Sequence, residues 1–389
     1  MKLFKNATLY SPDYQGIQDV LISGNKIIAI DDAIKVNASH GLQTIDCRGQ
    51  LLVPGFVDSL VHITGGGGEG GFHTRTPQMP FSDAVKGGVT SLVGVLGTDA
   101  VTRSLEDVIA KAKALKHDGL SVYLHTGSYH YPVVNITGSI EKDIMLIDEC
   151  IGVGEIAIAD HRGSQLSWQE LARIAAQARV GGMLANKGGI VSIHVGDGDR
   201  GLSILHEVAE HSDIPISQFY PTHINRTEKV LAQGIALANA GGYIDFTTST
   251  TEQILADGEV AAPEALKRCL QENVNIAQIT MSSDGNASLP VFDSKGRLTD
   301  LQIGQVTSLH QAMVDAVKQH GVALNDALKT ITSNPADILG LTQKGQIELG
   351  FDADVLLLDA DTLTINQVFA QGKCLMNAAG EIKQSYFDS

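Results

Sequence analysis

Eight short apolar runs alternate with helix-like stretches through the middle of the chain, and this alternation limits the folds open to it. Between the runs, stretches such as 104–116 and 167–180 carry apolar residues at i, i+3 and i+4, with Ser104 and Ser167 as expected N-caps. Eight strand–helix units predict an α/β fold of the (β/α)8 TIM-barrel type, with a doubly wound open sheet as the alternative. The expected strands are 53–62, 89–96, 121–126, 153–160, 189–195, 217–223, 243–247 and 277–284.

Both ends of the chain are rich in β-branched runs. A Ser-Gly-Asn-Lys turn at 23–26 separates two such runs and is typical of a hairpin, and Gly and Asp turns divide the last segment in the same way. Because chain termini often lie close together, we expect the two ends to pair into one small β-sandwich domain. The predicted domains are 1–53 plus 344–389 for the β domain and 54–343 for the barrel.

Charge and composition exclude several classes of partner. The net charge of −16, from 44 acidic and 28 basic residues, repels phosphate backbones and anionic lipid, so we expect no nucleic-acid or membrane binding. No apolar stretch of the sequence approaches the roughly 20 residues of a membrane span. The four cysteines have no CxxC spacing and the N-terminus has no signal-peptide pattern, so the sequence predicts a soluble cytoplasmic protein with reduced thiols.

Four of the apolar runs end in a residue that can bind a metal or transfer a proton. These residues are His62, His194, His223 and Asp284. Glu155 lies within a fifth run, and a carboxylate that faces a barrel interior needs a charged partner. Catalytic groups of such barrels project from the strand ends on one face, so these side chains can converge. Two imidazoles and a carboxylate predict a catalytic metal site, with zinc fitting best. The metal would supply a hydroxide, and Asp284 would accept its proton and pass it to a leaving amine.

The remaining ten of the 13 histidines are predicted to be non-ligands, because a lone histidine is more often structural. They are His40, His73, His117, His125, His130, His161, His206, His211, His310 and His320.

Motifs along nearly the whole chain resemble the amidohydrolase superfamily and, more closely, the isoaspartyl dipeptidases within it. The KGxIxxGxDAD motif near the C-terminus is common to many amidohydrolases. The motifs GGGGE with TRTP, THxNR and SSDGN are more specific to the isoaspartyl dipeptidases. The resemblance implies metal-dependent hydrolysis of the β-aspartyl bond in isoAsp-X dipeptides. It also implies a homo-oligomer, with an octamer as one possible assembly. The segments are PGFVDSLVH, GGGGEGGFHTRTP, VLGTD, GSYHYP, ADHR, PTHINR, SSDGNAS and KGQIELGFDADVLLLD.

The resemblance also implies a role for each matching residue. A dipeptide with an additional carboxylate needs one anion for its ammonium group and forked guanidinium donors for its carboxylates. The implied metal ligands are His62, Glu155, His194, His223 and Asp284, with Asp284 also the acid/base. The implied substrate contacts are Glu69 for the α-amino group, Tyr129 for the oxyanion, Arg162, Arg226 and Ser288 for the carboxylates, and Thr98 and Gly67 lining the pocket.

Two residues depart from the family pattern. Leu60 stands where the first histidine of a His-x-His pair is expected, and it faces the same side of its strand as His62. Glu155 occupies the position of a lysine that, in the family, is commonly a carbamate bridging two metals. We therefore expect one firmly bound Zn²⁺ at Glu155, His194 and His223, and a second that is weak or absent unless a water or another side chain fills the gap.

Two other functions stay open at this stage. A dihydroorotase-like cyclic amidase or an N-acyl amino acid deacylase would share the fold and the metal, but its substrate has no free ammonium group for Glu69. A non-catalytic protein of the same fold would be consistent with Leu60.

Overall fold

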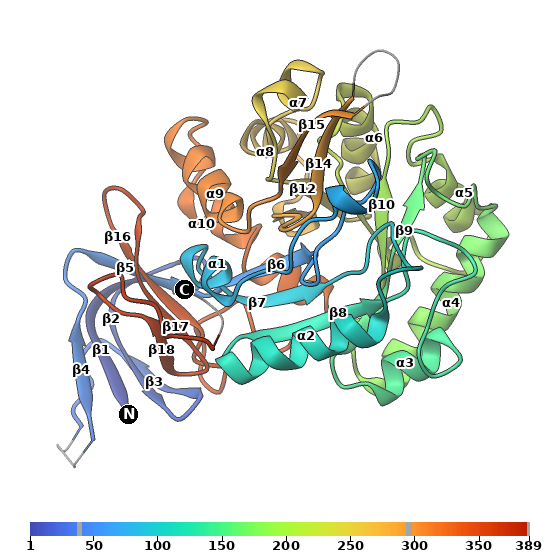
Figure 1. Cartoon of the computed structure of the whole chain (residues 1–389). Helices are drawn as coiled ribbons and strands as arrows, with labels where there is room; N and C mark the ends of the chain where they lie inside the picture. The colour runs from blue at the N-terminus through green and yellow to red at the C-terminus, as the bar shows by residue number, and fades with distance from the viewer. Residues whose placement is uncertain (37–40, 293–297, 387–389) are drawn as a thin grey trace.

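Eight parallel strands form the centre of the computed structural model, which describes residues 1–36, 41–292 and 298–386 (Figure 1). Seven of the predicted ranges contain one strand each, whereas β9 overlaps its range of 153–160 but begins earlier, at Cys150. The strands are β6 (Phe56–Val61), β7 (Val89–Gly94), β8 (Ser121–Thr126), β9 (Cys150–Ile158), β10 (Ile190–Val195), β11 (Phe219–Thr222), β12 (Ile244–Thr247) and β13 (Ile279–Ser282). Strands β6 to β11 form one sheet in chain order, and β12 pairs with β13.

Backbone hydrogen bonds connect the two sets of strands. Ile224 N donates to Asp245 O at 3.1 Å between the ends of β11 and β12, and His62 N donates to Gly285 O at 2.8 Å between the ends of β6 and β13. The strands thus follow one another from β6 to β13, and the last approaches the first. This is a mixed α/β fold of the TIM-barrel type.

Helices alternate with these strands, and their apolar faces make the largest core. The Ser104 and Ser167 N-caps are confirmed: each hydroxyl accepts a backbone N–H, and Ser167 forms a capping box with Glu170. The α-helices are α1 (Phe81–Lys86), α2 (Leu105–Asp118), α3 (Ile140–Leu146), α4 (Trp168–Ala185), α5 (Ser203–His211), α6 (Glu228–Asn239), α7 (Glu252–Ala256), α8 (Ala262–Gln271), α9 (Ser308–Lys318), α10 (Leu324–Lys329) and α11 (Ser333–Ile338). Short 3-10 turns are η1 (Phe72–Thr74), η2 (Ile216–Gln218) and η3 (Ile276–Gln278).

A second sheet combines strands from both ends of the chain. Its members are β1 (Lys2–Tyr10), β2 (Tyr14–Ser23), β3 (Lys26–Asp31), β4 (Gln43–Asp46), β5 (Gln50–Pro54), β16 (Val355–Asp359), β17 (Ile365–Ala370) and β18 (Lys373–Met376). Strands β5 and β16 join the two ends, with Leu52 opposite Leu357. The predicted hairpin is confirmed, since Ser23 pairs with Lys26. This sheet has a core of its own; the predicted domain limits stay a prediction.

A hairpin of β14 (Ser288–Phe292) and β15 (Leu298–Ile303) follows β13 directly after the predicted catalytic Asp284. Within the described ranges, none of the helices has both the length and the apolar character that a membrane span requires.

A buried lysine links the terminal segment to the barrel-type strands. Lys344 Nζ lies 2.6 Å from Asp354 Oδ2, 2.8 Å from Asp352 Oδ2 and 2.6 Å from Ser121 Oγ at the start of β8. Its side chain is 4% exposed, so the ion pair with Asp354 is shielded from water.

We expect Lys344→Met to lower the free energy of unfolding by about 3–5 kcal/mol, because it leaves the buried Asp354 carboxylate without its cation. Urea unfolding followed by circular dichroism measures the change. Lys229→Met is the control, since the Lys229–Asp199 pair is exposed and should contribute about 0–1 kcal/mol. Equal effects of the two substitutions would contradict the assigned role of Lys344.

Candidate active site

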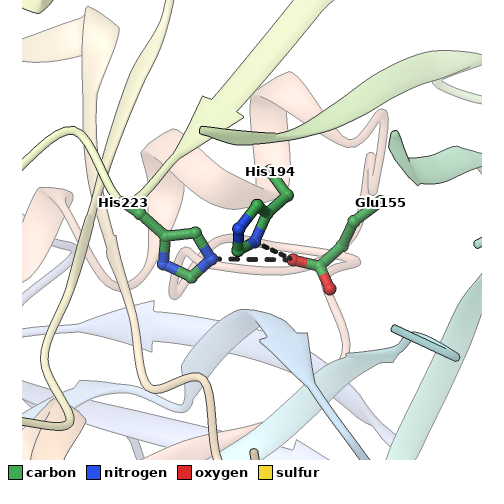
Figure 2. Close-up of side chains that lie close together, drawn as sticks. All are labelled: Glu155, His194 and His223. Carbon is green, nitrogen blue, oxygen red and sulfur yellow. Dashed lines mark ion pairs between the residues drawn. The ribbon is translucent and has the colours of Figure 1, made fainter. Parts of the chain in front are cut away.

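Three buried side chains from adjacent strands converge at the carboxyl ends of the barrel-type strands. Glu155 comes from β9, His194 from β10, and His223 directly follows β11 (Figure 2). Oε2 of Glu155 lies 3.7 Å from His194 Nδ1 and 3.7 Å from His223 Nε2. One ligand atom from each residue lies within 4.8 Å of the others, which makes this group a candidate metal site among the described residues.

The donor set of this group suits a divalent metal. Glu155 is 0% exposed, and within the described chain neither of its carboxylate oxygens has a hydrogen-bond partner. Burial would raise the pKa of Glu155, but His194 and His223 hold it well below its usual range. Burial and the nearby charge of His194 lower the pKa of His223 to about 4, so its imidazole is neutral near pH 7. One carboxylate and two imidazoles are a common set for catalytic zinc.

The backbone is strained at two of the predicted functional residues. His223 has φ of 63° and Asp284 has φ of 52°, both in the left-handed region that side chains other than glycine rarely adopt. Such conformations persist where the surrounding structure enforces them, and they cluster at functional sites.

His62 and Asp284 lie on the other side of Glu155. His62 Nε2 is 3.2 Å from Asp284 Oδ1 and 3.7 Å from Glu155 Oε1. Burial would raise the pKa of Asp284, but His62 lowers it below its usual value. Gly97 makes room for the imidazole, since a Cβ there would be 2.6 Å from His62 Cε1. Leu60, two residues before His62, is 2% exposed and offers no ligand atom.

Asp160 connects the metal group to a predicted substrate contact, and sequence reasoning missed it. Its Oδ2 accepts hydrogen bonds from Arg162 Nη2 at 2.6 Å and, with the tautomer that suits this contact, from His194 Nε2 at 3.0 Å. In this tautomer His194 Nδ1 carries the lone pair that a metal would bind, and carboxylate partners of metal-binding histidines commonly fix the ring in this way. Nδ1 also lies 2.7 Å from the Tyr129 hydroxyl. The signal was the ADHR segment, in which Asp160 precedes Arg162 by two residues.

The predicted substrate contacts gather beside His194. Glu69 Oε1 lies 3.2 Å from Arg162 Nη1, and Glu69 Oε2 accepts a hydrogen bond from Ser288 Oγ at 3.2 Å. The Arg162 guanidinium lies 5.5 Å from the centre of the Tyr129 ring. Gly67 has φ of 72°, and a Cβ there would be 2.9 Å from Ser288 Cβ, so glycine is required for this close approach.

Arg226 and Thr98 are less closely connected to this cluster. Arg226 N donates to His223 O at 3.0 Å, so the arginine is close to the metal group, and its buried Nε has no hydrogen-bond partner among the described residues. Thr98 follows Gly97, and its carbonyl lies 3.1 Å from His130 Nε2. Their proposed contacts with substrate stay predictions.

Arg103, which is not among the predicted site residues, fixes the glycine-rich loop of residues 65–71. Its guanidinium donates to Thr64 O, to Gly66 O at 3.0 Å and to Thr76 O at 3.2 Å. These bonds fix the loop that carries Gly67 and Glu69. The contacts join residues 27 to 39 positions apart, so no local motif could have revealed them.

Comparison with known proteins identifies the family to which the chain is similar. Residues 51–377 match the family model described as Amidohydrolase family. A crystal structure of β-aspartyl dipeptidase from Fervidobacterium islandicum AW-1, in complex with the β-Asp-Leu dipeptide, is 43% identical in sequence. The match covers 99% of both chains with a TM-score of 0.92.

Other proteins match with lower identity. N-acetylglucosamine-6-phosphate deacetylase from Pasteurella multocida is 16% identical, with a TM-score of 0.64 over 96% of this chain and 99% of that one. Adenine deaminase from Oceanobacillus iheyensis is 23% identical over 90% of this chain, which spans 53% of that protein. L-hydantoinase from Paenarthrobacter aurescens is 23% identical over 92% of this chain and 85% of its own length.

We expect Asp160→Asn to weaken metal retention about 10- to 100-fold, because His194 loses the carboxylate that orients its ring. Competition with a chromophoric chelator measures the dissociation constant. Asp199→Asn, a change in an exposed ion pair, is the control and should leave this constant unchanged. Wild-type metal affinity in Asp160→Asn would show that the Asp160–His194 contact is not part of the metal site.

Proposed function

The chain belongs to the amidohydrolase family, and on this premise we propose that it is a zinc-dependent isoaspartyl dipeptidase. Its substrates would be isoAsp-X dipeptides, cleaved at the β-aspartyl amide bond. The β-aspartyl dipeptidase of F. islandicum, with 43% identity over 99% of both chains, supports this substrate class.

One observation carries the proposal: the Glu69–Arg162 ion pair stands beside the metal group. A dipeptide substrate brings an ammonium group and a carboxylate of its own. Each can replace one half of this pair, with the ammonium group binding to Glu69 and the carboxylate to the Arg162 guanidinium. Arg162 is also tied to His194 through Asp160, so substrate binding and the metal group share one network.

Asp284 and Tyr129 each have a protonation state that suits the proposed role. A divalent metal bound at Glu155, His194 and His223 would supply a hydroxide nucleophile near neutral pH and polarise the scissile carbonyl. Despite its burial, Asp284 has a lowered pKa because of His62, so it is ionised and can accept a proton before passing it to the departing amine. Burial and the charge of Glu155 raise the pKa of Tyr129 well above its usual value, so its hydroxyl stays protonated and can donate to the oxyanion.

Finer features of the architecture belong to the same proposal. The eight barrel-type strands would close as a (β/α)8 barrel over 54–343, and the terminal sheet would form a small β-sandwich from 1–53 and 344–389. We also propose a cytoplasmic homo-oligomer, with an octamer as one possible assembly.

We expect the protein to hydrolyse isoAsp-Leu and not Asp-Leu, because only the β linkage places the scissile carbonyl at the metal while Glu69 holds the ammonium group. Activity should disappear after dialysis against a chelator and return on addition of Zn²⁺. Release of free leucine, measured by chromatography, gives both rates. Equal cleavage of the two dipeptides, or full activity in the metal-free protein, would contradict the proposed function.

Glu69→Gln should lower kcat/KM for isoAsp-Leu about 10- to 100-fold, since a charged hydrogen bond contributes about 1.5–3 kcal/mol. Glu106→Gln, at an exposed position in the first turn of α2, is the matched control and should retain wild-type activity. A cyclic amidase would behave differently, because dihydroorotate or an N-acyl amino acid has no free ammonium group and its hydrolysis would be insensitive to Glu69→Gln. Hydrolysis of those substrates in place of isoAsp-Leu would favour that alternative.

A further inference from the structure

His125 is buried among the barrel-type strands, and its ring makes no hydrogen bond to the part of the chain that the structure describes. It is the fifth residue of β8 and is 0% exposed, and neither ring nitrogen has a partner within residues 1–36, 41–292 and 298–386. A neutral imidazole carries one N–H, and leaving such a group unpaired in the interior costs about 1–3 kcal/mol. An exception of this kind requires an explanation.

The side chain of His125 faces away from the covering helices. Leu124 belongs to the core between the strands and the helices, whereas Tyr123 packs against a different core that contains Val57. Because successive side chains of a strand point to opposite faces, His125 lies on the same face as Tyr123. It therefore points into the space that the barrel-type strands surround.

The neighbouring strand leaves room for this ring and places a charge near it. His125 is paired in register with Gly152 of β9, where a Cβ would lie 3.2 Å from His125 Nε2. Glu155 lies three residues further along β9, and its carboxylate charge acts on His125. Burial lowers the pKa of His125 to about 4 against the effect of that charge, so the ring is neutral and has a lone pair to donate.

On the side of Glu155 away from His194 and His223, the candidate active site contains the imidazole of His62 and the carboxylate of Asp284. Glu155 itself supplies a second carboxylate there. Glu155 uses Oε2 toward His194 and His223, whereas its Oε1 lies 3.7 Å from His62. Asp284 Oδ1 and Glu155 Oε1 are both buried, and neither has a hydrogen-bond partner in the described chain. Leu60 cannot supply a second imidazole from β6.

We propose that His125 replaces the imidazole that Leu60 lacks, and that it binds a second divalent metal ion together with His62, Asp284 and Glu155 Oε1. This inference rests on the proposed metal-dependent function. In it, an imidazole ligand from β8 takes the place of the one expected from β6. Among the described residues, Glu155, His194 and His223 form the one group of three possible ligands whose ligand atoms all lie within 4.8 Å of one another. The ligands of the second ion are less closely gathered, so this ion should bind more weakly than the first.

Metal uptake tests the proposal without relying on activity. Wild type, His125→Leu, His125→Gln and the double variant Leu60→His/His125→Leu are equilibrated at a series of buffered free Zn²⁺ concentrations. Bound zinc per chain is then measured by mass spectrometry, and Co²⁺-loaded samples are compared by electron paramagnetic resonance for coupling between two ions. His310→Leu is the matched control, because His310 is a partly buried histidine in α9 whose Nε2 lies 2.8 Å from Leu363 O.

The wild type and His310→Leu should bind two ions in two steps. His125→Leu should lose the weaker step and keep the stronger one, which also shows that it is folded. His125→Gln should bind the second ion at least about tenfold more weakly. The double variant should recover the second ion, since it returns an imidazole to the first strand.

A second ion bound with wild-type affinity by His125→Leu would overturn the proposal, as would a wild type that binds only one ion. Both results would leave the proposed function intact. A wild type that binds no metal would overturn the proposed function as well.

Discussion

The buried carboxylate of Glu155 is the group on which the site depends. It is 0% exposed, and isolated burial of its charge would be prohibitive without nearby cations or cation-binding partners. Its two oxygens face different residues: Oε2 is near His194 and His223, and Oε1 is near His62. The Glu155 side chain thus lies between His194 and His223 on one side and His62 on the other.

The substrate and metal groups are physically joined through Asp160. Its carboxylate accepts hydrogen bonds from Arg162 and lies 3.0 Å from His194 Nε2, and Arg162 in turn pairs with Glu69. His194 and Arg162 lower the pKa of Asp160 although burial would raise it, so the connecting group remains an anion. Under the proposed function, this one carboxylate would position both the arginine that binds the charged dipeptide and a histidine that binds the metal.

The strands and the metal group could be predicted from the sequence because both depend on local pattern. A short apolar run that ends in histidine identifies a buried strand and its functional end together, as at His194 and His223. Asp160 and Arg103 could not be assigned in this way. Arg103 acts on carbonyls 27 to 39 residues away, and the role of Asp160 depends on β9 and β10 lying side by side. A sequence motif contains neither of these relations.

Leu60 and His125 show a further limit of sequence patterns. The absence of a histidine at Leu60 is visible in the motif, but its consequence depends on which residues of other strands face the same interior space. That depends on strand register, and irregularities between β8 and β9 and between β9 and β10 shift it. Read in isolation, His125 is one histidine among 13. Beside Gly152 and Glu155, it is a neutral imidazole without a hydrogen-bond partner among the described residues, in the strand next to the central carboxylate. Under the proposal for His125, a metal ligand moves from β6 to β8 while the site is kept, because side chains from more than one of the barrel-type strands face the same interior space.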